Sequence, residues 1–199
     1  MTSAGPHPFP IRTERLVLRR WRDEDRAPFA AMNADARVVE HLPGPMTRQQ
    51  SDALVDRVEA NFASRGFDVF AVEVAETGEF AGFVGLTVPR FEAAFTPCVE
   101  IGWRLAPALW GRGYATEAAQ ASLAFGFERL GLPEIVSFTV PANVRSRRVM
   151  ERIGMTHDPR EDFDHPLLPE GDRLRRHVLY RIRALQDGRS SPPTHGAGA

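Results

Sequence analysis

The chain has 199 residues, of which 43% are apolar and 26% charged, and this composition fits one globular domain with a sizeable core. Its formal net charge of −1 gives no general attraction to nucleic acid or anionic lipid, so neither is expected as a partner. The single cysteine, Cys98, cannot form an internal disulfide, and no apolar run has the length of a signal peptide or a transmembrane helix. These features predict a cytoplasmic protein, and they leave open whether it is a monomer or a homodimer.

The two ends of the chain differ in composition from its middle. Three prolines, a glycine and small polar residues fill much of the first ten positions, which cannot bury much surface. We therefore divide the chain into a disordered arm at 1–10, one domain at 11–185 and a disordered tail at 186–199.

The first half of the domain contains signals for a strand and two helices. Apolar residues at 16–18 predict a short strand within 15–21, and the acidic run 23–25 suits the start of a helix. Farther on, Thr47 and Gln50 have the spacing of a capping box, which predicts a second helix ending near Gly66.

Three strands are predicted next. The runs 67–74 and 79–88 flank a turn at Thr77 and Gly78, which is the pattern of a β-hairpin. The run that follows alternates with period two, which predicts a strand with one face formed by Val99, Ile101, Trp103 and Leu105.

A glycine-containing turn joins this strand to a predicted helix. Apolar residues recur at helical spacing through Leu130, and Gly131 supplies a stop signal about four turns after the start. Within the turn, Gly111 and Gly113 let a ligand approach the main chain, and the unpaired N–H groups of a helix start favour an anionic phosphate. A plain tight turn is the alternative. The dinucleotide fingerprint is excluded because Thr116 stands where it requires glycine, and no Gly-Lys-Ser/Thr of a Walker-type loop is present.

The last third of the chain continues the alternation of strands and helices. The run 134–140 predicts a strand, Asn143 can cap a short helix that closes at Gly154, and 176–182 predicts a final strand. The intervening run 156–175 is irregular, and a loop of this length often serves as a lid or a substrate wall. The order of elements predicts a mixed α/β sheet with helices on both faces.

Two blocks of this sequence resemble motifs of the GNAT superfamily. The run Trp110–Ala115 is similar to the family's acyl-CoA loop, Gln/Arg-x-x-Gly-x-Gly/Ala, with Trp110 in place of Gln/Arg. The run Asn143–Ser146, continued by Ile153–Met155, is similar to the family's Asn-x-x-Ser helix that ends in Gly-Met/Phe. The version Trp-Gly-Arg-Gly-Tyr-Ala-Thr-Glu-Ala looks like that of the RimJ/RimL-like branch, whose known members acetylate protein N-termini.

This resemblance implies a fold, a reaction and a set of binding residues. The fold is the GNAT α/β (α+β) fold, a mixed, mostly antiparallel twisted sheet with helices on both faces. The reaction moves the acetyl group of acetyl-CoA to a primary amine, of a protein N-terminus or a small molecule, by direct attack in a ternary complex. No metal is implied. The implied cofactor-binding residues are Trp103, Leu105, Gly111, Arg112, Gly113, Tyr114, Ala115, Thr116, Asn143 and Ser146.

Amine acetylation benefits from a base, and Glu100 is the first candidate. It lies on the predicted strand and points away from the face of Trp103, so it can line a cleft on the opposite face. The alternatives are a solvated glutamate and an ion pair with Arg104. His177 is a second candidate, although a histidine on a strand is more often structural. Three residues of the irregular loop could also meet the amine, although a surface turn is the favoured role for them: Asp162, Asp164 and His165.

The departing sulfur needs a proton or a hydrogen bond. Many GNAT enzymes place a tyrosine seven residues after the asparagine, but here this position is Met150. Ser146 occupies the place of the RimJ/RimL-like proton donor, and the low pKa of a thiol lets a hydrogen bond suffice. The alternative is a serine that satisfies a backbone group at the helix start.

Three further interpretations remain open. Arginines of the short helix can reach the CoA 3′-phosphate or form a solvated basic face: Arg145, Arg147, Arg148 and Arg152. The fold can also serve as an acyl-CoA-binding sensor without turnover, or as a generic nucleotide-phosphate enzyme. The acidic and histidine residues of the last third lack a metal-ligand spacing, so no metal is expected.

Overall fold

The computed structural model describes residues 9–184. The arm expected at 1–10 and the tail expected at 186–199 lie outside this range, except for Phe9 and Pro10. Phe9 does not belong to a loose arm. Its ring packs edge-on against Phe62 and Phe70, with centroids 5.6 and 5.0 Å away. An aromatic side chain of this size buries enough apolar surface to hold the chain end in place.

Nine strands form one sheet in the order β1-β2-β3-β4-β5-β6-β9-β7, and β8 pairs separately with β9. Every adjacent pair is antiparallel except β5 and β6, which are parallel, so the predicted mixed and mostly antiparallel sheet is confirmed. The strands are β1 (Ile11–Arg12), β2 (Leu16–Arg19), β3 (Val69–Val74), β4 (Phe80–Thr87), β5 (Glu100–Leu105), β6 (Glu134–Thr139), β7 (Thr156–His157), β8 (Phe163–Asp164) and β9 (Arg176–Arg183).

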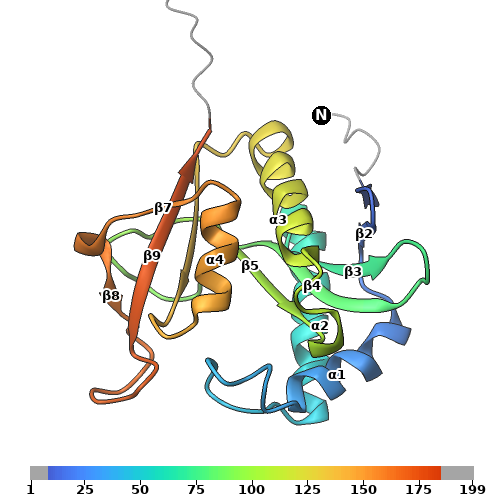
Figure 1. Ribbon diagram of the computed structural model, residues 1–199, viewed down its shortest axis with the longest axis horizontal. Coiled ribbons are helices and arrows are strands. Elements are labelled where there is room, and N and C mark those ends of the chain that lie inside the picture. Colours follow the sequence, from blue (N-terminus) through green and yellow to red (C-terminus); the bar gives the residue numbers. More distant parts are fainter. Residues whose placement is uncertain (1–8, 185–199) are drawn as a thin grey trace, which may run out of the picture.

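Helices cover both faces of the sheet, as predicted (Figure 1). On one face, the ring of Phe83 in β4 lies 6.0 Å from that of Phe29 in α1. Leu86, three positions along the same strand, points to the opposite face and meets Gly126, which follows α3. The α-helices are α1 (Arg26–Ala34), α2 (Arg48–Arg65), α3 (Tyr114–Ala124) and α4 (Val144–Arg152). None of the described helices is long and apolar enough to cross a membrane.

The predicted limits of α2 are confirmed by its end groups. Thr47 Oγ1 accepts the N–H of Gln50 at 3.2 Å, and Gln50 Oε1 accepts the N–H of Thr47 at 2.8 Å. Gly66 ends the helix with a φ of +82°, a left-handed conformation that favours glycine.

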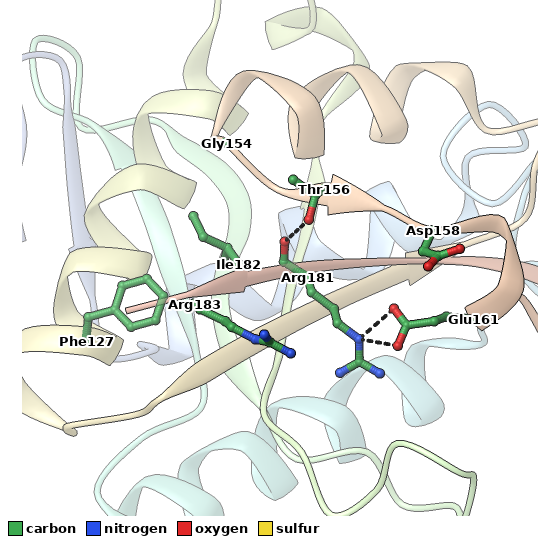
Figure 2. A pocket seen from close by; sticks show the side chains of 8 residues that line it. All are labelled: Phe127, Gly154, Thr156, Asp158, Glu161, Arg181, Ile182 and Arg183. Carbon is green, nitrogen blue, oxygen red and sulfur yellow. Dashed lines mark hydrogen bonds and ion pairs between the residues drawn. The ribbon is translucent and has the colours of Figure 1, made fainter. Parts of the chain in front are cut away.

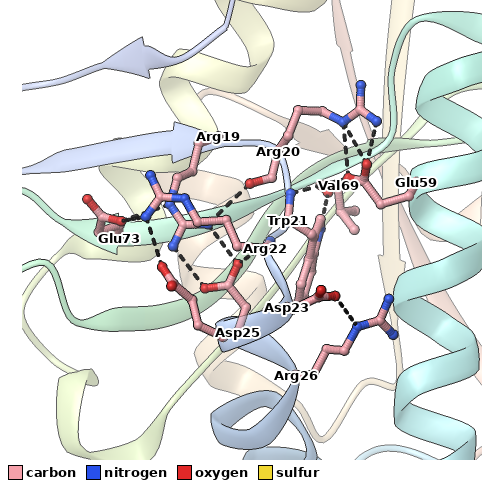
Figure 3. Close-up of polar contacts among 11 residues, drawn as sticks. Arg19, Arg20, Trp21, Arg22, Asp23, Asp25, Arg26, Glu59, Val69 and Glu73 are labelled. Atoms are coloured by element: carbon pink, nitrogen blue, oxygen red, sulfur yellow. Dashed lines mark hydrogen bonds and ion pairs between the residues drawn. The ribbon is translucent and has the colours of Figure 1, made fainter.

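A buried ion network joins the start of α1 to β2 and β3 (Figure 3). The guanidinium of Arg19 donates two hydrogen bonds to Asp25, at 2.7 and 2.8 Å, and a third to Glu73 at 2.8 Å. The acidic run 23–25, expected as a helix start, forms a short 3₁₀ turn that directs Asp25 inward. Arg20 forms an ion pair with Glu59 of α2 in the same region. Ion pairs as well as apolar packing therefore hold α1 and α2 against β2 and the residues that follow it.

The structure differs from the prediction mainly in short elements. β1 precedes the expected first strand, and the region 156–175, expected to be irregular, contributes β7 and β8 as partners of β9. A strand of two residues is too short to show a periodicity. Each of these strands is stabilised by the strand with which it pairs. The predicted helix through Leu130 is continuous, but its last turn, Phe125–Arg129, is a π-helix.

The parallel junction of the sheet opens into a split. β4 pairs with β5 along all six residues of β5, and β6 pairs with β9 along all six residues of β6. By contrast, the register of β5 and β6 contains one pair, Glu100 with Val136, supported by a bond from the N–H of Val136 to the carbonyl of Val99 at 2.9 Å. The two strands therefore diverge beyond Glu100.

Candidate functional site

A cavity of about 680 Å³ occupies the region of this split, and we call it the β5/β6 cavity. Its lining includes residues of β5, β6, α1, α2 and the start of α4. Four of the residues expected as first base, acid or cofactor ligands line it together: Glu100, Trp103, Asn143 and Ser146. They come from two segments separated by about forty positions, which the divergence of the strands brings to one space.

Glu100 lies on the face of β5 that Gly102 and Arg104 share, opposite to Ile101 and Leu105. Its side chain lines the cavity, and among residues 9–184 its carboxylate makes no hydrogen bond or ion pair. Burial raises the pKa of Glu100 from 4.5 to about 8. The alternative ion pair with Arg104 is absent within the described range, because Arg104 donates instead to Asn33 Oδ1 at 2.6 Å.

The edge of β5 that faces the split carries free main-chain groups. The carbonyl of Val99 accepts a hydrogen bond from β6, whereas the N–H of Ala106 donates to Ala81 of β4 on the other side. Since main-chain groups along a strand alternate between its two edges, the odd-numbered residues of β5 direct their N–H and C=O groups toward the split. By this alternation the N–H groups of Trp103 and Leu105 point toward the split. The carbonyl of Leu105 accepts the indole N–H of Trp110 at 2.8 Å, which fixes the entry to the loop.

The loop before α3 presents an uncapped helix start. Gly111 and Gly113 have φ values of +77° and +82°, a region that glycine enters without strain, and Gly113 is the N-cap. From Gly111 to Thr116, no main-chain N–H donates to another residue of the described range, and the first such bond runs from Glu117 N–H to the carbonyl of Gly113. Six consecutive free donors at a helix N-terminus suit a phosphate or pyrophosphate.

Residues near the N-terminus hold this loop, and sequence reasoning missed them. Arg15 forms an ion pair with Glu117 at 2.6 Å and donates to the carbonyl of Arg112 at 2.9 Å. Thr13 Oγ1 also donates to Glu117, at 2.6 Å. Glu117 and Arg15 are 102 positions apart, and no local pattern marks such a pair.

The predicted cap of α4 by Asn143 is confirmed. Asn143 Oδ1 accepts the N–H of Ser146 at 3.2 Å, and its Nδ2 donates to Thr139 Oγ1 at 3.0 Å. The hydroxyl of Ser146 makes no hydrogen bond to any residue that the structure describes, and Ser146 lines the cavity. Its hydroxyl is therefore available to a ligand.

The other base candidates have structural partners. His177 packs against Phe138 at a centroid distance of 5.9 Å, its Nδ1 lies 3.1 Å from the carbonyl of Arg175, and burial lowers its pKa. It is not part of the cavity lining. Asp162 bonds to His157 at 2.7 Å, and Asp164 pairs with arginines at 3.4 Å. His165 alone of this group lines the cavity, and burial lowers its pKa too.

Two other kinds of chemistry find no support at the described residues. Burial raises the pKa of Cys98 to about 11, so its thiol is protonated at neutral pH and is a poor nucleophile. No group of three or more histidine, cysteine, aspartate or glutamate side chains within 9–184 has a metal-binding arrangement.

A second hollow of about 770 Å³ lies beside β9 (Figure 2), and it shares no lining residue with the β5/β6 cavity. Its charged groups are paired within the described part of the chain: Arg181 pairs with Glu161 at 2.9 Å, Arg183 with Glu134 at 2.9 Å, and Asp158 with Arg160. It is lined by Phe127, Gly154, Thr156, Asp158, Glu161, Arg181, Ile182 and Arg183, none of which was a candidate site residue. The β5/β6 cavity and the loop before α3 are therefore the candidate functional site.

Comparisons with known proteins identify the family of this chain. Residues 15–156 match the acetyltransferase (GNAT) domain family. A Bacillus subtilis protein described as the uncharacterized N-acetyltransferase YnaD is 30% identical over 173 residues, which cover 86% of this chain and 95% of YnaD.

Solved structures share the fold. The crystal structure of an acetyltransferase from Agrobacterium tumefaciens is 32% identical, with a TM-score of 0.71 over 92% of this chain and 98% of that one. A structure of RimL, described as a ribosomal L7/L12 α-N-protein acetyltransferase in complex with coenzyme A, has a TM-score of 0.69 over 86% of this chain and 95% of its own. At 18% identity, this likeness concerns the fold alone. The chain belongs to the GNAT family and is an acetyl-CoA-dependent acetyltransferase.

Proposed function

We propose that this acetyltransferase moves the acetyl group of acetyl-CoA to a primary amine by direct attack in a ternary complex. The observation that carries the proposal is that Glu100 and Ser146, each without a hydrogen-bond partner for its side chain among the described residues, line one cavity at the split of the sheet. Such an arrangement offers a base and a hydrogen-bond donor on either side of a reacting carbon.

The donor substrate fits the main chain around the split. We infer that the free N–H groups from Gly111 to Thr116 bind the pyrophosphate and that the N–H groups of Trp103 and Leu105 bind the pantetheine arm and the thioester oxygen. Asn143 lies beside this path as a further polar contact. The guanidinium of Arg145, 4.7 Å from the centroid of the Trp110 ring, is close to the loop and supplies charge for a phosphate.

Glu100 is the proposed base. The neutral amine attacks the carbonyl carbon, the new C–N bond forms, the C–S bond breaks, and Glu100 receives the proton that the amine nitrogen loses. A pKa of about 8 makes its carboxylate a stronger base than an ordinary glutamate, and this value matches the range of α-amino groups. A lysine amine, with a reference pKa near 10.4, would transfer its proton to Glu100 less readily. The match favours an α-amine or a small amine of similar pKa.

Ser146 is the proposed partner of the departing sulfur. Its hydroxyl is free within the described range, and a hydrogen bond to the thiolate stabilises the leaving group without full proton transfer. The resemblance of Trp110–Thr116 and Asn143–Ser146 to RimJ/RimL-like motifs supports a place in that branch, whose known members use protein N-termini. A small-molecule amine remains the second class of acceptor.

Release of free CoA thiol tests the proposal. Purified protein is mixed with acetyl-CoA and a panel containing short peptides with free N-termini and small primary amines. Thiol that appears only when protein, acetyl-CoA and amine are all present supports catalysis. Tight binding of acetyl-CoA without thiol release from any amine would instead support the non-catalytic sensor. Thermal stabilisation by ATP or NAD but not by CoA would favour a different nucleotide enzyme.

A further inference from the structure

The β5/β6 cavity carries an excess of positive charge, although the whole chain has a formal net charge of −1. Its lining contains two acids, Asp68 and Glu100, and four arginines: Arg57, Arg65, Arg90 and Arg104. Asp68 is engaged within the protein, since it accepts the N–H of Val69 at 2.7 Å and the amide of Asn61 at 2.6 Å. Burial raises the pKa of Glu100 to about 8, so the negative charge of this carboxyl group is reduced at neutral pH.

Arg104 is the arginine that the fold holds most firmly in this cavity. Its Nη1 donates to Asn33 Oδ1 at 2.6 Å, and Asn33 is itself fixed by a bond from its Nδ2 to Ser51 Oγ at 2.9 Å. The guanidinium carbon lies 5.4 Å from the centroid of the Phe83 ring. These contacts fix the position of the charge but do not neutralise it.

No carboxylate within residues 9–184 pairs with Arg104, and its Nε and Nη2 donate to no described group. Arg104 is partly buried, and burial lowers its pKa from 12.5 to about 10. A partly desolvated cation without an anionic partner attracts an anion more strongly than a cation in open water, so this site favours an external anion. The free edge of the guanidinium matches the two oxygens of a carboxylate.

The strand between Glu100 and Arg104 leaves room for a ligand. Both residues lie on one face of β5, with Gly102 between them. A Cβ placed on Gly102 would have no atom within 4 Å, so this stretch of the cavity wall is open. At the usual rise of a strand, the Cα atoms of Glu100 and Arg104 are about 13 Å apart. This spacing suits a small amine or a peptide end that carries a second polar group.

We propose that Arg104 binds a carboxylate of the acceptor, which lies across Gly102 with its amine at Glu100. The inference rests on the proposed function and narrows the acceptor to amines that also bear a carboxylate. These include amino-acid-like small molecules and N-terminal peptides with an acidic side chain close to the amine.

Matched pairs of acceptors test this inference. Each pair contains a carboxylate and its primary carboxamide: ω-amino acids of three to eight carbons with their amides, and Ala-Glu-amide with Ala-Gln-amide. For the pair whose spacing fits, we expect kcat/KM of the carboxylate to exceed that of the carboxamide by about tenfold or more. Arg104→Gln, whose amide can still donate to Asn33, should remove this preference while CoA affinity is unchanged. Arg104→Lys should keep part of it.

Binding without turnover separates this inference from the proposed function. N-acetylated products of the same acids are titrated calorimetrically into the CoA-bound protein and into its Arg104→Gln variant. Binding that weakens about tenfold in the variant supports the carboxylate site even if no amine is acetylated. Equal turnover of carboxylates and carboxamides by the unmodified protein would overturn the inference. So would a preference that survives in Arg104→Gln, or the absence of product binding to the unmodified protein. Thermal unfolding of each variant reports whether the fold is intact.

Discussion

Glu100 occupies a strand position where no described neighbour offers its carboxylate a hydrogen bond. Because burial disfavours the charged form, the pKa of Glu100 rises to about 8, and the same burial carries a cost in stability. An acid whose pKa is raised on folding stabilises the native state fully below its unfolded pKa. That stabilisation is lost as the pH rises toward the folded pKa.

Glu100→Gln should lower kcat/KM by about 100-fold, because a general base contributes roughly that much. An amine of low pKa, which stays neutral from pH 6 to 9, isolates the titration of Glu100. With this acceptor the rate of the unmodified protein should rise with pH and level off above about 8, whereas the Gln variant should show no such rise. A pH profile with the same rise in both proteins would assign the titration to another group.

The stability of the same two proteins provides an independent readout. The unfolding free energy of the unmodified protein should decrease between pH 4.5 and about 8 relative to that of Glu100→Gln, and the difference should then stay constant. Urea unfolding at pH 5 and pH 9 measures this difference. The same difference in unfolding free energy between the two proteins at pH 5 and at pH 9 would contradict the raised pKa of Glu100.

Ser146→Ala should reduce kcat about tenfold and leave CoA affinity nearly unchanged, because the proposed hydrogen bond of its hydroxyl strengthens as the sulfur leaves. Single-turnover rates and calorimetry with CoA measure the two effects. Ser64→Ala is a matched control, since Ser64 is exposed on α2 and bonds only to the carbonyl of Asn61 in the described part of the chain. An unchanged rate for Ser146→Ala would leave the serine a structural role.

For single residues, local sequence patterns predicted the roles of some side chains but not the contacts between residues that are far apart in the chain. Alternation along one strand was enough to direct Glu100 away from Trp103, and a local motif marked Asn143 as a cap. Arg104 was considered only as a partner for Glu100, because its true partner, Asn33, is 71 positions away. A contact between such distant positions depends on how α1 packs across the sheet, which no local pattern records.

α2 is the element in which prediction and structure agree best. Its capping box at Thr47 and Gln50 and its end residue Gly66 are local signals, and they lie next to the helix ends they control. The two-residue strands β7 and β8 are the contrast. They exist because β9 offers them unpaired main-chain groups, and a sequence of two residues contains no pattern to show this.

Gly113→Trp should abolish measurable CoA binding. Gly113 has a φ of +82° at the N-cap of α3, where a bulky side chain would strain the loop and obstruct its free N–H groups. Gly131→Trp is a matched control, because Gly131 also has a positive φ, +64°, but lies beyond the far end of the helix with no atom within 4 Å of its added Cβ. Retention of CoA affinity in Gly113→Trp, measured by calorimetry on folded protein, would contradict the assignment of this loop.

Over the whole molecule, the type of sheet was easier to predict than the neighbours of each strand. The alternating order of strands and helices indicated a mixed sheet with helices on both faces, which the structure confirms. The split between β5 and β6 could not be predicted from local patterns. It requires two strands separated by α3 to meet at Glu100 and then diverge.

Asp25→Asn should destabilise the protein by about 3 kcal/mol, because it leaves Arg19 with a buried charge that has lost its two-bond partner. Asp25 does not line the β5/β6 cavity, so CoA affinity of the folded variant should be unchanged. Asp23→Asn is the control. Asp23 has a 99% exposed side chain, and its pair with Arg26 should contribute less than about 1 kcal/mol. Equal urea midpoints for the two variants would show that the buried network is not a major source of stability.

The narrow junction at Glu100 also affects the mechanics of the sheet. β1–β5 are joined to one another by successive antiparallel pairs, and β9 is paired with β6, β7 and β8, yet a single rung connects the two half-sheets. A pantetheine arm bound as proposed would lie where the missing main-chain hydrogen bonds between β5 and β6 would otherwise form. We expect bound CoA to reduce the relative motion of the two half-sheets, and release of CoA to restore it.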